Sequence, residues 1–124
     1  MPIIFRGDDK FAYRDPTCYY FGGLYHLFFT VSEKDGGYMY NRVGYSVSED
    51  LDTWRDVGTY TLGQDGWDFA SGRLTAAFAM PLAHDLGHKY AVLFHGSRAD
   101  AFPETHGNAS LALAFTDDFK EYRF

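Results

Sequence analysis

Hydrophobic residues in this chain fall in short runs separated by segments rich in Gly, Pro and Asp. No run has the 3.6-residue period of an amphipathic helix over three turns. Residues 24–29 are apolar at nearly every position, which is typical of a strand covered on both faces. The pattern predicts an all-β chain with eight strands, at about 17–21, 24–31, 38–47, 53–57, 74–82, 89–95, 109–116 and 120–124.

The strand pattern is repeated once along the chain. Three positions recur at one constant offset, with Pro16, Tyr25 and Phe29 corresponding to Pro81, Tyr90 and Phe94. Residues 46–54 match residues 114–122 at a slightly larger offset, which a longer loop in the second copy explains. The repeat predicts one domain over residues 1–124 made of two similar units.

Each unit is predicted to be a four-stranded antiparallel sheet, the first at about 12–58 and the second at about 72–124. Residues 60–71 have no clean period and are predicted to connect the units. Eight short strands could also form a sandwich, but a long repeated unit closed by an aromatic residue is more typical of β-propeller blades. We therefore expect an incomplete propeller, whose open faces need missing blades or self-association into a homo-oligomer.

Composition narrows the possible partners. Aromatic residues make up 19% of the chain, which favours strands and suits stacking on sugars. The formal net charge of −6 disfavours nucleic acid, because binding phosphates requires clustered Lys and Arg. Cys18 is the single cysteine, so an internal disulfide is excluded, and we expect Cys18 to be a buried small hydrophobe.

The sequence as given predicts no membrane partner and a cytoplasmic location. It has no apolar stretch of about 20 residues, and the apolar run near its N-terminus is too short for a signal peptide. Secretion remains open if a leader has been removed. Residues 108–110 form a glycosylation sequon of a kind that often arises by chance.

Two motifs carry a resemblance to a known family. The first is Tyr13-Arg14-Asp15-Pro16 followed by the aromatic run at 23–29, and the second is Ser48-Glu49-Asp50-Leu51-Asp52-Thr53-Trp54. With them the chain resembles the five-bladed β-propeller glycoside hydrolases, the arabinanase and β-fructosidase clan of families 43 and 32. The resemblance implies hydrolysis of furanosides or pyranosides in pentose- or fructose-containing glycans, a carbohydrate partner and no cofactor.

The resemblance also implies roles for single residues. Asp15 matches the family's aspartate that holds the substrate and stabilises the oxocarbenium-like transition state, and Arg14 beside it becomes a substrate-binding candidate. The family's general acid precedes a Pro in the next blade, but here Ala79 and Met80 stand there and can supply no carboxyl. The family's nucleophile or base belongs to an earlier blade; Asp8 and Asp9 are its only candidates here, or else form a solvated turn.

Other candidates follow from the residues themselves. Glu104 lies in the longest loop of the second unit and is the best substitute for the acid, although a Glu in a loop with Pro and Gly is usually just solvated. Trp67 and Asp68 together can bind a sugar by ring stacking and by accepting hydroxyl hydrogen bonds, or Trp67 can be a core residue. His95 follows an inner-strand Phe and either lines the channel or is a structural histidine.

Several residues are predicted to be structural. The histidines lack the spacing of a zinc site, so we expect no metal. Asp50 and Asp118 are predicted to bond nearby backbone donors in turns, and Trp54 and Tyr122 to close equivalent strand ends.

The sequence thus predicts a glycoside hydrolase-like protein of carbohydrate metabolism that is incomplete or inactive alone. The alternative is a non-catalytic module, either carbohydrate-binding or purely structural and self-assembling.

Overall fold

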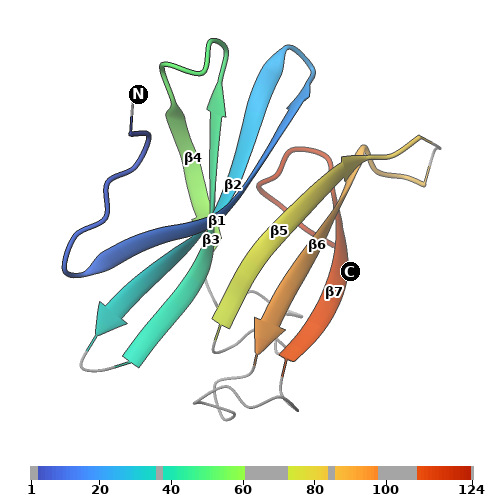
Figure 1. The fold of residues 1–124 in the computed structure, drawn as a ribbon. Coiled ribbons are helices and arrows are strands. Elements are labelled where there is room, and N and C mark those ends of the chain that lie inside the picture. Colours follow the sequence, from blue (N-terminus) through green and yellow to red (C-terminus); the bar gives the residue numbers. More distant parts are fainter. Residues whose placement is uncertain (1–2, 36–37, 61–72, 84–85, 98–108, 124) are drawn as a thin grey trace.

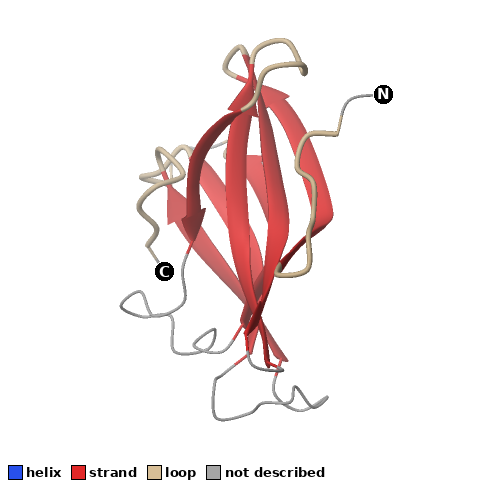
Figure 2. Ribbon diagram, turned by 90° about the vertical axis from the view of Figure 1, so that its left-hand side faces the viewer, coloured by secondary structure: helices blue, strands red, loops and turns tan. Residues whose placement is uncertain are grey.

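The computed structural model describes residues 3–35, 38–60, 73–83, 86–97 and 109–123. In this part of the chain the regular structure is all strand, without helix, as predicted (Figure 2). The strands are β1 (Phe11–Phe21), β2 (Leu24–Asp35), β3 (Tyr38–Ser48), β4 (Arg55–Tyr60), β5 (Arg73–Pro81), β6 (Tyr90–Ser97) and β7 (Ala109–Thr116).

The strands form two antiparallel meanders. The first runs β1-β2-β3-β4 and the second runs β5-β6-β7, each strand pairing with the next. A single parallel pair, Asn41 with Arg73, links β3 to β5. Figure 1 shows the meanders as two layers lying side by side. We call β1–β4 the first layer and β5–β7 the second layer.

The first hairpin depends on two glycines. Phe21 and Leu24 are paired, so Gly22 and Gly23 form a two-residue turn, with φ of 62° and 78°. Tight hairpin turns with two positive φ values match the right-handed twist of the strands, and glycine adopts such angles without steric cost. The sequence Gly22-Gly23 therefore fixes the register of β1 on β2.

The main core lies between the layers. The first layer contributes Phe28, Val43, Tyr45 and Val47, and the second contributes Ala79, Val92, Phe94, Ala114 and Phe119. Phe28, Val43, Val92 and Phe94 are fully buried. Because strand side chains alternate between faces, each layer places one face in this core and turns the other outward.

The outward face of the first layer has a smaller cluster of its own. Leu27, Phe29 and Val31 of β2 are buried there, with Phe5, Phe11 and Trp54 packed against them. Phe5 belongs to the N-terminal segment, which runs along the side of the first layer that faces away from the second (Figure 1).

The strand registers of the two layers match. Tyr25 pairs with Ser48 in the first layer, and Tyr90 pairs with Thr116 at the same place in the second. Pro16 and Pro81 do not match in this way: Pro16 lies at an irregularity inside β1, whereas Pro81 pairs with Tyr90 at the end of β5. The sequence alignment of the first strands is therefore displaced, because a longer connection precedes β6 than precedes β2.

Two sequence predictions are wrong. Residues 120–123 form no eighth strand; after β7 the chain makes a turn and returns to a single bridge between Phe115 and Arg123. Cys18 is exposed, because it lies on β1 at the edge of the first layer.

Candidate functional site

The Arg14-Asp15-Pro16 segment interrupts the ladder between β1 and β2. Arg14 pairs with Thr30 and Thr17 pairs with Phe28, so two residues of β1, Asp15 and Pro16, oppose only Phe29 on β2. This count defines a β-bulge, and Pro suits it because Pro has no N–H to offer the ladder. We call this segment the β1 bulge.

Asp15 has an unfavourable backbone conformation at the bulge. Its φ is 53°, in the left-handed region that few residues other than glycine adopt. A following proline further restricts the residue before it to extended conformations. A conformation of this kind costs on the order of 1–3 kcal/mol and is typical of functional positions. Asp15 is exposed at the edge of the layer.

Arg14 is held in place by a buried hydroxyl. Its Nη2 donates a 2.7 Å hydrogen bond to Oγ of Ser32, which is 1% exposed. Arg14 is itself exposed, so its remaining donors can face a ligand. The β1 bulge thus combines a carboxylate and a positioned guanidinium on adjacent residues.

An apolar hollow of about 270 Å³ adjoins the bulge. Its walls come from Ile4, Phe5, Tyr13, Arg14, Pro16, Leu27 and Phe29. The ring of Phe5 lies 5.4 Å from that of Tyr13 and 4.8 Å from that of Phe29, between centroids. The sequence pattern does not predict this hollow, because nothing in the N-terminal segment indicates that Phe5 packs on β2.

The second layer has a bulge at the corresponding place. Pairing in β5 shifts between Thr75 and Phe78, as pairing in β1 shifts between Arg14 and Thr17. Ala76 and Ala77 therefore occupy the bulge positions that Asp15 and Pro16 occupy in β1. One of the two bulges carries a carboxylate and the other carries none.

Of the other predicted site residues, the structure describes His95, which does not lie at the β1 bulge. His95 lies on β6 of the second layer, opposite Thr75 and Leu111. Ala79 is 1% exposed and lies in the core between the layers. Trp67, Asp68 and Glu104 lie outside the described residues.

The predicted turn residues are confirmed by two matching turns. Oγ of Ser48 accepts hydrogen bonds from the amides of Asp50 and Leu51, and Oδ1 of Asp50 accepts from the amides of Asp52 and Thr53. These backbone bonds, that from Thr53 first, hold the pKa of Asp50 below its usual value.

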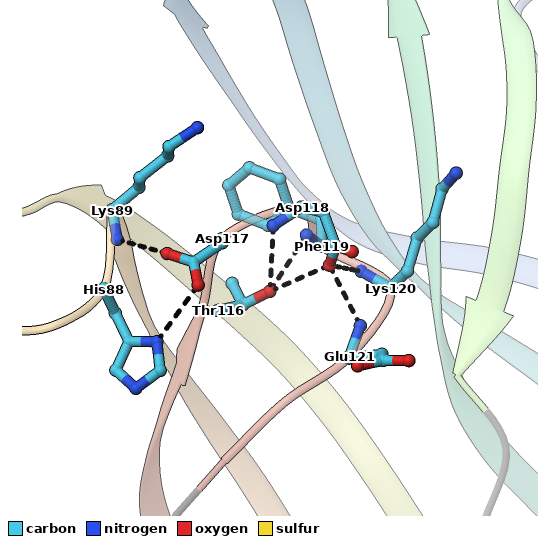
Figure 3. A network of polar contacts seen from close by, with 8 residues as sticks. All are labelled: His88, Lys89, Thr116, Asp117, Asp118, Phe119, Lys120 and Glu121. Atoms are coloured by element: carbon cyan, nitrogen blue, oxygen red, sulfur yellow. Dashed lines mark hydrogen bonds and ion pairs between the residues drawn. The ribbon is translucent and has the colours of Figure 1, made fainter.

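The second turn repeats this arrangement (Figure 3). Thr116 Oγ1 accepts from Asp118 and Phe119, and Asp118 Oδ1 accepts from Lys120 and Glu121. The amides of Glu121 and Lys120 likewise lower the pKa of Asp118. A residue of positive φ follows the aspartate in both turns, Leu51 at 69° and Phe119 at 59°.

The aromatic residues that close these turns are structural, as predicted. Trp54 packs on the outward cluster of the first layer. Tyr122 packs on the main core, with its ring 5.4 Å from that of Phe94.

Two further carboxylates bind backbone groups. Asp8 accepts hydrogen bonds from the amides of Lys10 and Phe11, which lower its pKa, so Asp8 acts as a turn residue. Asp117 accepts from the amide of Lys89 at 2.8 Å and lies 3.3 Å from Nδ1 of His88 (Figure 3). The bond from Lys89 is the main cause of the lowered pKa of Asp117. Asp117 therefore ties the segment before β6 to the end of β7.

The described residues lack the features of two other classes of site. Across the described ranges, no three His, Cys, Asp or Glu side chains cluster in a way that could hold a metal ion. Nor does that part of the chain contain a helix long and apolar enough to cross a membrane. No family model matches the chain, and a search of curated proteins finds no match.

Proposed function

We propose that this chain is a carbohydrate-recognising segment of a glycoside hydrolase-like β-propeller and that the β1 bulge is its sugar-binding site. The observation that carries the proposal is the exposed carboxylate of Asp15, held at a positive φ beside an anchored arginine. The repeated meanders, packed face to face, support the propeller architecture.

The chemistry of the bulge suits sugar hydroxyls. The Asp15 carboxylate is an acceptor of two or more hydroxyl hydrogen bonds, and the Arg14 guanidinium is a donor. Hydrogen bonds to charged groups contribute about 1.5–3 kcal/mol each, more than neutral ones. Because Arg14 and Asp15 lie on the edge strand of the first layer, a glycan can approach them without opening the core.

The described residues favour binding over hydrolysis by the chain alone. Glycoside hydrolysis uses two carboxyl groups, roughly 5–10 Å apart, around the scissile bond. Ala76 occupies the second bulge and Ala79 is buried, so neither supplies a partner for Asp15. Glu104 remains the candidate acid for the hydrolase form of this proposal.

Titration calorimetry with arabino-oligosaccharides and fructo-oligosaccharides tests the binding proposal. We expect the wild-type chain to bind at least one of the two classes and Asp15→Asn to weaken that binding roughly tenfold or more. The matched control is Asp52→Asn, which removes an exposed carboxylate from the loop after β3 and is expected to bind as the wild type does. Absence of binding to both glycan classes, or equal losses in the two variants, would overturn the proposal.

Release of reducing sugar from the same oligosaccharides distinguishes hydrolysis from binding. If the wild-type chain releases sugar and Glu104→Gln stops the release while binding persists, Glu104 is the acid. Binding without release is the result we expect from the chain alone.

A further inference from the structure

The outward face of the second layer exposes a stripe of large apolar side chains. The exposed fractions are 37% for Leu93, 80% for Leu111 and 42% for Leu113. Leu93 pairs with Leu113, and Leu111 lies two residues before Leu113 in β7, so its side chain is on the same face. We call these three residues the leucine stripe.

The internal repeat shows that the corresponding face of the first layer is buried. Leu93 and Leu113 are a register pair of the second layer that corresponds to Phe28 and Tyr45 in the first. Leu111, opposite His95, corresponds to Val43, opposite Thr30. Phe28, Tyr45 and Val43 are 0–4% exposed, because they pack against the second layer. The leucine stripe is therefore the counterpart of a face that is buried by a neighbouring layer.

The face that covers Phe28 has its own counterpart in the first layer. It includes Val92 and Phe94 of β6, which correspond by the same register to Leu27 and Phe29 of β2. Leu27 and Phe29 lie on the outward face of the first layer and line the apolar hollow with Ile4. Ile4 is 44% exposed, so this face is apolar at its surface as well as beneath it.

We propose that the leucine stripe of one copy docks on the outward face of the first layer of a second copy, with Leu111 entering the hollow beside Ile4. The contact repeats between copies the layer-on-layer packing found within the chain. Such a contact is head-to-tail, so it adds copies until a ring closes or continues as an open chain. The inference does not rest on sugar binding: Asp15 and Arg14 can fail as a sugar site while the layers still dock.

Sedimentation of single-site variants tests the two faces separately. We expect the wild-type chain to associate as its concentration rises to about 0.1 mM. Leu111→Lys places a charge on the leucine stripe, and Ile4→Glu places one on the outward face of the first layer. Each is expected to weaken association roughly tenfold or more, since each removes a large apolar side chain from the contact. Both side chains are exposed, so both variants should keep the wild-type circular dichroism spectrum. The control, Leu86→Lys, replaces a 60% exposed leucine in the segment before β6, outside the strands that form both faces, and should associate normally.

A mixture of the two variants tests whether the contact between copies is head-to-tail. Leu111→Lys keeps an intact first layer and Ile4→Glu keeps an intact leucine stripe, so a head-to-tail contact predicts one-to-one dimers in the mixture and no larger species. A monomeric wild-type chain would overturn the proposal. So would normal association of either variant, or a mixture that forms no dimer.

Discussion

At the scale of single residues, His26 is a polar group placed inside the aromatic core. It is 7% exposed and stacks on Phe21, with ring centroids 3.8 Å apart. Its Nε2 lies 3.1 Å from the carbonyl oxygen of Phe21, which can only accept, so Nε2 carries the hydrogen. Its Nδ1 then accepts from the Tyr45 hydroxyl at 2.6 Å. Both ring nitrogens are thus satisfied in the neutral form.

This arrangement predicts a loss of stability in mild acid. Burial lowers the pKa of His26 below 6.5, so the unfolded chain binds a proton at a pH where the folded chain does not. The contribution of His26 is fully present above pH 6.5 and is lost as the pH falls from there toward the lowered pKa. Urea unfolding between pH 5 and 8 measures this slope.

The matched variant for this test is His26→Gln, which cannot titrate in that range. We expect its free energy of unfolding to fall less than that of the wild type as the pH is lowered, although it starts from a lower value. Identical slopes for the two proteins would show that His26 does not set the pH dependence.

Gly44 is a second residue with a definite steric role. It pairs with Phe29, and a Cβ added to Gly44 would lie 2.3 Å from a carbon of the Phe29 ring. Gly44→Ala is therefore expected to destabilise the fold by about 1–3 kcal/mol, as overpacking of a core does. In a Phe29→Leu background the same change should cost much less, which a double-mutant cycle by urea unfolding measures. Additive effects would mean that the ring does not cause the cost.

At the scale of elements, the two Ser/Thr-x-Asp turns are the most regular repeated feature. Thr116 is 1% exposed, and its hydroxyl accepts hydrogen bonds from two backbone amides. An apolar side chain of the same shape would leave these two amides without this acceptor. Thr116→Val keeps the shape but removes the acceptor, so we expect a loss of about 1–3 kcal/mol in the free energy of unfolding. Thr116→Ser keeps the acceptor and should retain most of the stability. A valine variant as stable as the serine variant would contradict this role.

The sequence predicts these elements unevenly, for physical reasons. Strand positions and both turns follow from local patterns, because alternation, Gly22-Gly23 and the Asp side chains act within a few residues. The β1 bulge depends on how β1 pairs with β2, and no local pattern gives that register. For the same reason the sequence predicts a buried Cys18: the residue type favours burial, but β1 is an edge strand and leaves Cys18 exposed.

The candidate site likewise combines features that the sequence predicts with features that depend on the fold. A sequence motif predicts Asp15 and Arg14 as site residues, but the bulge and the hydrogen bond from Arg14 to Ser32 depend on how β1 pairs with β2. The hollow beside them needs Phe5 to meet Phe29, a contact between the N-terminal segment and β2 that no period in the sequence encodes.

At the scale of the whole molecule, the main core is formed by residues of both layers together. The main cluster takes fully buried residues from both, such as Phe28 and Val43 from the first layer and Val92 and Phe94 from the second. A layer separated from the other would expose the face that these residues occupy. We therefore expect the layers to unfold together.

Hydrogen exchange in a core variant tests this coupling. Val92→Ala removes two methyl groups from the second layer and should cost about 1–3 kcal/mol by leaving a cavity. If the layers form one cooperative unit, the most protected amides of β2 and β3 should lose protection by the same free energy as those of β5 and β6. Leu113→Ala, at a 42% exposed position of the same layer, is the control and should change protection little in the unassociated chain. Loss of protection confined to β5–β7 would instead mean that the first layer is stable without the second, because its outward cluster around Phe29 would then suffice as a core.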